Sequence, residues 1–256
     1  MIAVVDAVQT RVVATLHGSL PMGGFVANAP IHALTAPLPA FDDAMQPAER
    51  TDIDLGGPLA FGIDNIISEA EADRIIALTE QMGYRPEAPG IQTAPGMRMN
   101  KSVHWVADAA LIQRIFARIG PLLPPQIDGD TLHPQLSQRL NMYRYDDNDV
   151  FNRHTDGDWP GFGLSADGTQ MVEWPGLRSK LTMLLYLNGP EQGVLGGNTR
   201  LFRPDGGAVD VTPRKGAALF FRHGFGRGSV LHEGARVLGE VPKYVARINV
   251  LYTQQG

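Results

Sequence analysis

The sequence contains no cysteine among its 256 residues. Disulfide bonds, thiolate metal sites and a cysteine nucleophile are therefore excluded, although the cellular compartment stays open. No apolar run approaches the roughly 20 residues that a membrane-spanning helix needs. The N-terminus also lacks the basic region and long apolar stretch that mark a signal peptide. We therefore expect a cytoplasmic protein that does not insert into a membrane.

Basic residues are also scarce. The chain has 22 Lys and Arg against 27 Asp and Glu, which gives a formal net charge of −5 and a pI near 5.8. Nucleic acids and anionic membrane surfaces attract positively charged proteins, so we expect neither as a partner. The hydrophobic content of 43% can supply a large core, and the length fits one large domain with an extension.

Glycine and proline, in contrast, are abundant, with 29 and 19 residues, as in folds built from short strands and many turns. Near the N-terminus, Ile2–Val5 and Arg11–Leu16 predict a short pair of strands. The Pro-, Ala- and Asp-rich segment Pro21–Pro58 predicts a loop or arm that lies over the domain. We therefore expect an N-terminal extension over residues 1–60 and one main domain over residues 61–256.

Two helices are predicted at about residues 68–120, at the beginning of the main domain. In the first, Ser68 and Glu71 form a capping box that satisfies free N–H groups of the first turn, and Gly83 ends the helix. The second covers about Asp108 to Ile119 and carries an apolar stripe at helical spacing. We expect both helices to pack outside a β core.

The pattern changes after Gln138 to short apolar segments separated by Gly, Pro, Asn and Asp, which predict strands. Many short strands of this kind close most simply as a jelly roll, so we expect a mainly β fold with flanking α helices. The one long gap, Gly157–Lys180, predicts a loop that we interpret as a substrate lid. The predicted strands are Leu140–Tyr145, Leu181–Leu187, Thr199–Phe202, Ala208–Val211, Ala217–Phe221, Ser229–Leu231 and Tyr244–Tyr252.

A candidate metal site begins with His154 and Asp156, which are two residues apart. On a strand both side chains point to the same side, where an imidazole nitrogen and a carboxylate oxygen can bind one ion. His232, at the end of a predicted strand, is the candidate third ligand. Two histidines and one carboxylate form a facial triad with open positions, as in non-haem Fe(II) oxygenases. Considered without the rest of the pattern, His154 and Asp156 could be a surface salt bridge, and His232 could cap a turn.

The last predicted strand carries two cations, Lys243 and Arg247, which are four residues apart and therefore share a face. A cation that projects into an apolar barrel is costly unless it meets an anion. The distal carboxylate of a dicarboxylate co-substrate would be such an anion, and Arg247 could bind it through two parallel hydrogen bonds. The alternative is that one or both side chains extend to the rim of the barrel.

Six motifs follow one another in the β region. They read Tyr145-Asp-Asp-Asn148-Asp-Val-Phe151-Asn-Arg-His154-Thr-Asp156, Leu181-Thr-Met-Leu184-Leu-Tyr186-Leu187-Asn188, Gly196-Gly197-Asn198-Thr199-Arg200-Leu201-Phe202, Pro213-Arg-Lys-Gly216-Ala-Ala-Leu219-Phe-Phe221, His232-Glu-Gly234-Ala-Arg-Val237, and Gly239 with Lys243. In this order they resemble the Fe(II)/2-oxoglutarate dioxygenase superfamily, most closely its prolyl-4-hydroxylase-like branch. Asn148 stands where the family has a turn glycine, and Asn198 stands where it has a glutamate outside the metal set.

This resemblance implies a double-stranded β-helix, or jelly roll, in which His154, Asp156 and His232 bind Fe(II). It also implies 2-oxoglutarate as co-substrate, O₂ as oxidant and ascorbate as a candidate reductant. The expected reaction is hydroxylation of an unactivated C–H bond of a small molecule, an amino acid or a peptidyl residue, with release of succinate and CO₂. Halogenating relatives lack the carboxylate that corresponds to Asp156, so hydroxylation is favoured.

The resemblance also implies which residues hold 2-oxoglutarate. Arg247 is the first candidate for the distal carboxylate, because its spacing after the second histidine occurs elsewhere in the superfamily. Lys243 is the second candidate, since it matches the family's Gly-x-Lys position in a longer turn. Tyr186 matches a tyrosine that helps to bind the distal carboxylate, and Tyr143 or Tyr145 would lie near the chelating end.

Two other classes stay open on the sequence alone, namely a cupin-like metal enzyme without 2-oxoglutarate and a non-catalytic jelly-roll binding protein. A position in a turn explains His223 better than contact with a substrate, and helix–sheet packing explains His104 as well as a place in the pocket does. A solvated basic turn explains Arg98 and Lys101 better than contact with an acidic substrate. The sequence leaves the substrate open, and a homodimer is expected only because jelly-roll enzymes often dimerise.

Overall fold

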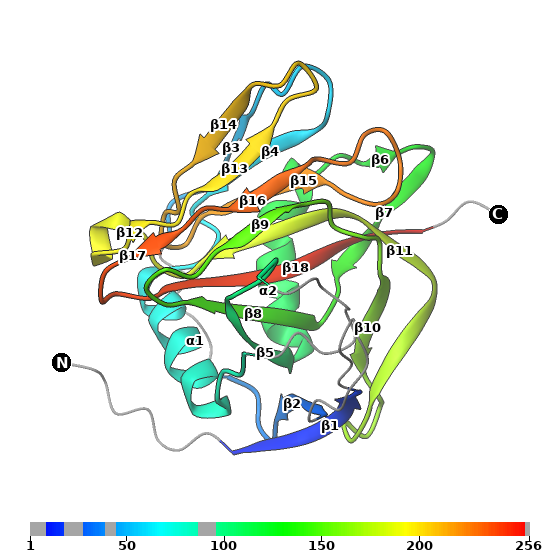
Figure 1. The fold of residues 1–256 in the computed structure, drawn as a ribbon. Helices are drawn as coiled ribbons and strands as arrows, with labels where there is room; N and C mark the ends of the chain where they lie inside the picture. The colour runs from blue at the N-terminus through cyan, green and yellow to red at the C-terminus, as the bar shows by residue number, and fades with distance from the viewer. Residues whose placement is uncertain (1–8, 18–27, 39–44, 87–95, 254–256) are drawn as a thin grey trace.

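Strands are the main regular structure in the residues that the structure, a computed structural model, describes: 9–17, 28–38, 45–86 and 96–253. The larger of the two main sheets has twelve strands, and the smaller one of four strands lies over part of its face (Figure 1). The main path through the larger sheet runs, in spatial order, through β1 (Thr10–Leu16), β2 (Ala29–Leu34), β5 (Lys101–Val106), β8 (Arg139–Tyr145), β18 (Lys243–Thr253), β11 (Met171–Tyr186), β15 (Ala218–Arg222), β4 (Ala60–Asp64) and β3 (Glu49–Asp52).

Three further strands join the larger sheet beside this path. They are β10 (Pro160–Leu164) next to β11, β7 (Asp130–Leu136) next to β18, and β6 (Gln126–Ile127) next to β7. The smaller sheet consists of β14 (Ala208–Val211), β13 (Thr199–Phe202), β16 (His232–Gly234) and β9 (Phe151–His154), and β12 (Leu195–Gly196) pairs separately with β17 (Val237–Leu238). The mainly β jelly-roll core predicted from the sequence is thereby confirmed.

Two helices flank the larger sheet, as predicted. In α1 (Glu69–Met82), the Ser68 hydroxyl accepts the Glu71 N–H and the Glu71 carboxylate accepts the Ser68 N–H, so the capping box is confirmed. Gly83 ends this helix with a φ of 85°, which glycine adopts without steric cost. In α2 (Ala109–Ile119), the Asp108 carboxylate caps the first turn, and the short 3₁₀ helices η1 (Gly120–Leu122) and η2 (Pro190–Gln192) complete the set.

The helices share one apolar core with the larger sheet. Ile75 and Leu78 of α1, Leu111 and Ile115 of α2, and Trp105 of β5 are almost completely buried in it. Burying a side chain of this size stabilises the fold by about 1.5–3 kcal/mol. The opposite face of the central strands is free to form the site. No helix in the described part of the chain is long and apolar enough to cross a membrane.

The structure corrects the predicted lid. Residues 157–180 hold β10 and the first half of β11, which pair as an antiparallel hairpin instead of forming a loop. The glycines of β10 hid the strand pattern, and they are needed because the Trp174 ring crosses the strand. A Cβ on Gly163 would lie 2.3 Å from a ring atom of Trp174, and one on Gly161 would lie 2.9 Å from another.

The N-terminal predictions also change. Pro21–Pro58 contains the strands β2 and β3 and is therefore not a single loop. The strand predicted over Arg11–Leu16 exists as β1, but it pairs with β2, and the proposed partner Ile2–Val5 lies outside the described residues. The described parts of the N-terminal extension add strands at both edges of the larger sheet. Further along, the predicted strand Ser229–Leu231 is not formed. The observed strand β16 begins directly after it, at His232, where its pairing with β9 starts.

Candidate metal centre

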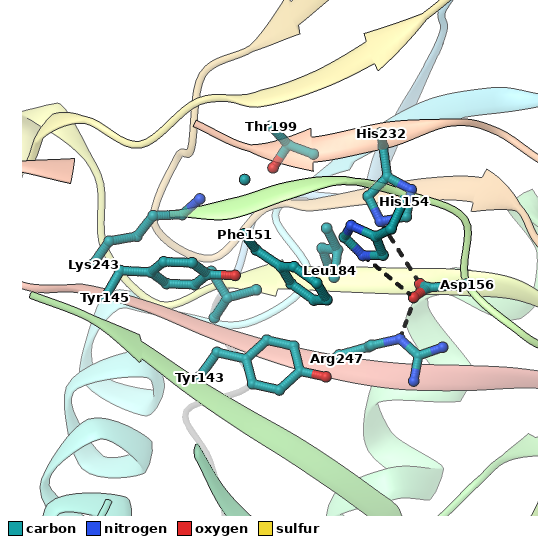
Figure 2. Close-up of a pocket in the computed structure, with 12 residues that line it drawn as sticks. Tyr143, Tyr145, Phe151, His154, Asp156, Leu184, Thr199, His232, Lys243 and Arg247 are labelled. Carbon is teal, nitrogen blue, oxygen red and sulfur yellow. Dashed lines mark hydrogen bonds and ion pairs between the residues drawn. The ribbon is translucent and has the colours of Figure 1, made fainter. Parts of the chain in front are cut away.

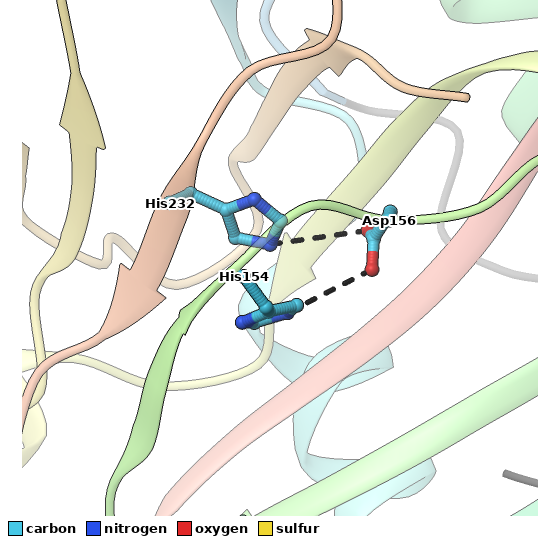
Figure 3. A group of neighbouring side chains, drawn as sticks. All are labelled: His154, Asp156 and His232. Atoms are coloured by element: carbon cyan, nitrogen blue, oxygen red, sulfur yellow. Dashed lines mark ion pairs between the residues drawn. The ribbon is translucent and has the colours of Figure 1, made fainter. Parts of the chain in front are cut away.

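The two candidate histidines lie opposite each other on neighbouring strands. β9 ends at His154, β16 begins at His232, and the antiparallel register pairs these residues directly. Paired residues point to the same face of a sheet, and the two ring centroids are 4.2 Å apart. Asp156 reaches the same point, with Oδ1 3.8 Å from Nε2 of His154 and Oδ2 3.9 Å from Nε2 of His232 (Figure 3). One ligand atom from each residue lies within 4.8 Å of the others, so the three can share one metal ion.

Backbone carbonyls determine which nitrogen of each histidine faces Asp156. Nδ1 of His154 lies 2.7 Å from the carbonyl oxygen of Asn152, and Nδ1 of His232 lies 3.1 Å from that of Val230. A carbonyl can only accept a hydrogen bond, so Nδ1 carries the proton in both rings. Nε2 therefore keeps the free lone pair that a metal ligand needs, and it faces the third candidate ligand, Asp156.

The protonation states of the three residues also suit a divalent cation. Burial, followed by the charge of His232, lowers the pKa of His154 to about 4, and burial lowers the pKa of His232 as well. Burial alone would raise the pKa of Asp156, but the Arg247 guanidinium and then the two histidines hold it well below its usual range. At neutral pH the site offers two neutral imidazoles and one carboxylate, which is the state that binds a metal.

Asp156 is held by two donors on one of its oxygens. The Thr182 hydroxyl donates to Oδ2 over 2.6 Å, and Nε of Arg247 donates to the same atom over 3.0 Å. Since one oxygen receives both hydrogen bonds, the rotation of the carboxylate is fixed. Such outer partners orient the ligands of metal sites and adjust their affinity.

A buried chain of hydrogen bonds extends from Thr182 away from the metal centre. Because the Thr182 hydroxyl donates to Asp156, it accepts from Nδ1 of His223 over 2.7 Å. Nε2 of His223 then accepts from the Ser179 hydroxyl over 2.8 Å, and that hydroxyl accepts the Trp159 N–H over 2.9 Å. Each donor in the chain has one acceptor, so the Thr182 hydrogen points at Asp156.

We expect Thr182→Val to weaken Fe(II) binding by about 10–100-fold, the usual effect of losing an outer partner of a metal ligand. Valine keeps the shape of the side chain but cannot donate to Asp156. Thr182→Ser keeps the hydroxyl and should bind Fe(II) almost as the wild type does. Anaerobic titration against a competing chelator measures both variants, and equal affinities for the valine and serine variants would contradict the role of the hydroxyl.

A pocket opens beside the metal centre and extends to Lys243 at its far end (Figure 2). Both sheets contribute to its walls. The lining residues are Tyr143, Tyr145, Phe151, His154, Asp156, Leu184, Thr199, His232, Gly234, Lys243, Val245 and Arg247.

Lys243 is a buried cation without a carboxylate partner among the described residues. Its side chain is 2% exposed, and its ammonium group donates to the carbonyl oxygen of Gly197. The rings of Tyr145 and Tyr186 lie beneath the ammonium, with centroids 5.2 and 5.5 Å away. Burial lowers the pKa of Lys243 to about 7. A buried ammonium with unused donors is suited to an incoming carboxylate.

The predicted co-substrate residues fall into two groups. Lys243 and Tyr145 lie at the far end of the pocket, whereas Arg247 and Tyr143 lie near the metal centre (Figure 2). Tyr186 is buried behind the wall and donates its hydroxyl hydrogen to Thr199 over 2.8 Å. Lys243 and Arg247, the two candidates for the distal carboxylate of 2-oxoglutarate, thus lie at different distances from the candidate iron ligands, although they share one face of β18.

Three contributors to the site were missed or misjudged in the sequence. Thr182 could have been found, because strand alternation places it on the same face as Leu184, which lines the pocket. His223, predicted in a turn, directly follows β15, but its side chain is 1% exposed and bonded to Thr182. Arg98 was expected in a solvated turn, yet its guanidinium lies 4.6 Å from the centroid of the Tyr143 ring.

Comparisons with known proteins agree with this geometry. The sequence profile of the 2OG-Fe(II) oxygenase superfamily matches residues 140–251, which hold all three candidate ligands. No curated protein sequence matches the chain.

The solved structures that share its fold include three prolyl hydroxylases. The viral collagen prolyl hydroxylase of Paramecium Bursaria Chlorella virus-1 is 19% identical, with a TM-score of 0.50, over 77% of this chain and 96% of its own. A Pseudomonas putida prolyl-4-hydroxylase is 17% identical, with a TM-score of 0.50, over 79% and 96%. A Trichoplax adhaerens prolyl hydroxylase, in complex with a peptide fragment of the hypoxia inducible factor oxygen degradation domain, is 17% identical, with a TM-score of 0.52, over 76% and 83%. Residues 140–251 therefore match the 2OG-Fe(II) oxygenase superfamily, and this match together with the metal centre supports a 2-oxoglutarate-dependent non-haem iron oxygenase.

Proposed function

We propose that this oxygenase hydroxylates an unactivated C–H bond of a small molecule, an amino acid or a peptidyl residue. The observation that carries the proposal is a single pocket with two different ends. One end has two neutral histidines and a carboxylate, a set that suits Fe(II). The other end has a buried lysine without a carboxylate partner in the described chain, which suits the distal carboxylate of 2-oxoglutarate.

His154, Asp156 and His232 would hold the iron. Fe(II) with 2-oxoglutarate supplies the oxidation: O₂ is consumed, one oxygen atom enters the C–H bond, and 2-oxoglutarate leaves as succinate and CO₂. The protein contributes the protonation states and the orientation of the ligands. The apolar side chains of Leu184 and Val245 in the pocket wall help to exclude water from the reacting centre.

We assign the distal carboxylate of 2-oxoglutarate to Lys243 and not to Arg247, the first candidate on sequence spacing. Arg247 already donates Nε to the metal-centre carboxylate, so its side chain is at the near end of the pocket. Lys243 is at the far end, where the Tyr145 and Tyr186 rings enclose its ammonium group. Arg247, together with Tyr143, would then adjoin the chelating end of the co-substrate.

The prolyl hydroxylases among the similar structures support a peptidyl substrate as one candidate, although fold similarity alone does not determine a substrate. The net charge of −5 supports the expectation that nucleic acid is not a partner. Ascorbate as reductant, a cytoplasmic location, the absence of a membrane partner and a homodimer stay predictions.

The alternatives account for less of the site. A cupin-like metal enzyme without 2-oxoglutarate gives the buried Lys243 no anion to bind. A non-catalytic binding protein has no use for histidines that are held neutral beside a carboxylate that is held anionic. Both alternatives predict that the protein does not bind 2-oxoglutarate together with Fe(II).

The proposal is tested by anaerobic titration of the protein with Fe(II), with 2-oxoglutarate, and with both. We expect the visible charge-transfer band of an Fe(II)–2-oxoglutarate chelate to appear only when both are present. Succinate should then form when O₂ is admitted. If no band appears while another divalent metal binds tightly, the proposal is wrong and the cupin-like alternative takes its place.

A further inference from the structure

Three arginines, Arg98, Arg139 and Arg247, gather along the inner face of β8. On this strand Arg139 and Tyr143 alternate with residues such as Leu140, whose side chain belongs to the main apolar core. Side chains two or four residues apart on a strand share a face. Arg139 therefore faces the same side of the sheet as Tyr143, which lines the pocket.

The other two arginines reach this face from neighbouring segments. Arg247 on β18 is paired in register with Asn141, midway between Arg139 and Tyr143. The guanidinium of Arg98, which precedes β5, lies 4.6 Å from the centroid of the Tyr143 ring. It lies 5.0 Å from the ring of Phe151, which in turn stacks on a candidate iron ligand. The arginine row is thus adjacent to the metal centre.

Each guanidinium in the row has a buried N–H group without a hydrogen-bond partner among the residues that the structure describes. The atoms are Nη2 of Arg98, Nε of Arg139 and Nη2 of Arg247. Over the same residues, Arg98 and Arg139 form no ion pair, and Arg247 is paired only with Asp156. Buried donors are nearly always satisfied in folded proteins, so three unsatisfied cationic donors in one region are suited to bind an anionic ligand.

Aromatic rings support two of these guanidinium groups by their faces. Arg98 lies over Tyr143, and Arg139 lies 5.4 Å from the centroid of the Phe162 ring in the β10–β11 hairpin. Stacking holds the planar group in place and leaves its edge available. That edge, with its parallel N–H groups, is the part of arginine that binds a carboxylate or a phosphate.

The charges in the site leave these arginines uncompensated even with iron and co-substrate bound. A divalent iron offsets Asp156 and the chelating carboxylate of 2-oxoglutarate, and Lys243 offsets the distal carboxylate. Burial lowers the pKa of Arg139 to about 10, yet the group is still charged at neutral pH. The positive charges of Arg98 and Arg139 therefore remain without a partner among the described residues, Arg247 keeps a free donor beside Asp156, and burying unpaired charges is costly.

We propose that the arginine row is the substrate-anchoring site, and that the substrate is a small molecule carrying an oxyanion, either a carboxylate or a phosphate. This inference rests on the proposed function, since it names the substrate class of the site whose pocket Arg247 lines. The oxyanion binds along β8, and the carbon to be oxidised is directed at the metal centre. A substrate without a negative charge would leave the arginines unpaired and would be rejected.

The test is isothermal titration of the anaerobic protein saturated with Fe(II) and 2-oxoglutarate, so that Lys243 is already occupied. The probes are benzoate, phenyl phosphate and uncharged benzyl alcohol. We expect at least one of the two anions to bind and the alcohol not to bind. Arg98→Gln and Arg139→Gln should each weaken anion binding by about tenfold, as expected for the loss of one charged hydrogen bond. Arg214→Gln, which changes an exposed arginine paired with Asp64, should have no effect.

Further comparisons separate this inference from its premises. Arg98→Lys keeps the charge, and it should retain more anion affinity than Arg98→Gln even if both variants melt at lower temperature. The visible Fe(II)–2-oxoglutarate band is recorded on the same samples, so its absence would count against the proposed function. Normal bands without anion binding, binding of benzyl alcohol equal to that of the anions, or unchanged affinity in both glutamine variants would overturn the arginine-row site.

Discussion

Replacing His154 by alanine is expected to abolish measurable Fe(II) binding and, with it, the release of succinate. The imidazole supplies one of three ligand atoms that lie within 4.8 Å of one another, so the variant keeps only Asp156 and His232 of the described cluster. Loss of an outer partner of a metal ligand costs about 10–100-fold in affinity, so loss of a ligand should cost more. Anaerobic Fe(II) titration, followed by the visible band with 2-oxoglutarate, measures the effect.

His133→Ala is the matched control for this variant. His133 on β7 is also partly exposed and also lies beside an aromatic ring, that of Trp174 at 6.3 Å, but it is not in the metal centre. It should bind Fe(II) as the wild type does. Because burial and His232 keep the pKa of His154 near 4, the difference between the variants should persist throughout the neutral range. Fe(II) affinity of the His154 variant equal to that of the control would remove this residue from the ligand set.

The parts of the site that the sequence predicted are those set by short-range geometry. His154 and Asp156 are neighbours because the chain brings residues two apart to one side, and the α1 capping box depends on four consecutive residues. Patterns of this length can be read directly from the order of the residues. The jelly roll followed in the same way from the spacing of short apolar segments.

The parts that the sequence could not predict depend on how distant strands align. Lys243 and Arg247 share a face of β18, so alternation alone cannot tell which of them is nearer to the metal. The register with β8, which pairs Lys243 with Tyr145 and Arg247 with Asn141, decides it. Such a register results from the packing of the whole sheet.

Long-range contacts also explain two features that the sequence did not reveal. Ser179 and His223 are 44 residues apart and meet only because β11 pairs with β15, so the chain of hydrogen bonds to the metal centre has no local signature. The β10–β11 hairpin was taken for a loop because glycine disfavours strands in general. At Gly163 the close approach of Trp174 outweighs that preference.

The second large effect is expected at the far end of the pocket. Lys243→Met should raise the 2-oxoglutarate concentration needed for the visible band by about 100-fold, since truncating one partner of a buried charge pair costs about 2–5 kcal/mol. Methionine keeps the length of the side chain between the Tyr145 and Tyr186 rings but has no charge. Lys215→Met is the control, because that lysine has its own partner in Asp73 and lies outside the pocket. Equal 2-oxoglutarate affinities for the two variants would assign the distal carboxylate elsewhere.

The pH dependence of 2-oxoglutarate binding distinguishes Lys243 from any arginine. Burial lowers the pKa of Lys243 to about 7, so the free protein loses this charge as the pH rises above 7. A carboxylate binds the charged form, and binding therefore requires uptake of one proton, which weakens affinity by up to about tenfold per pH unit. Lys243→Arg stays charged over this range and should bind with a flat profile between pH 7 and 8.5. If the wild-type profile is flat as well, the group that holds the distal carboxylate does not titrate here, and Arg247 becomes the better assignment.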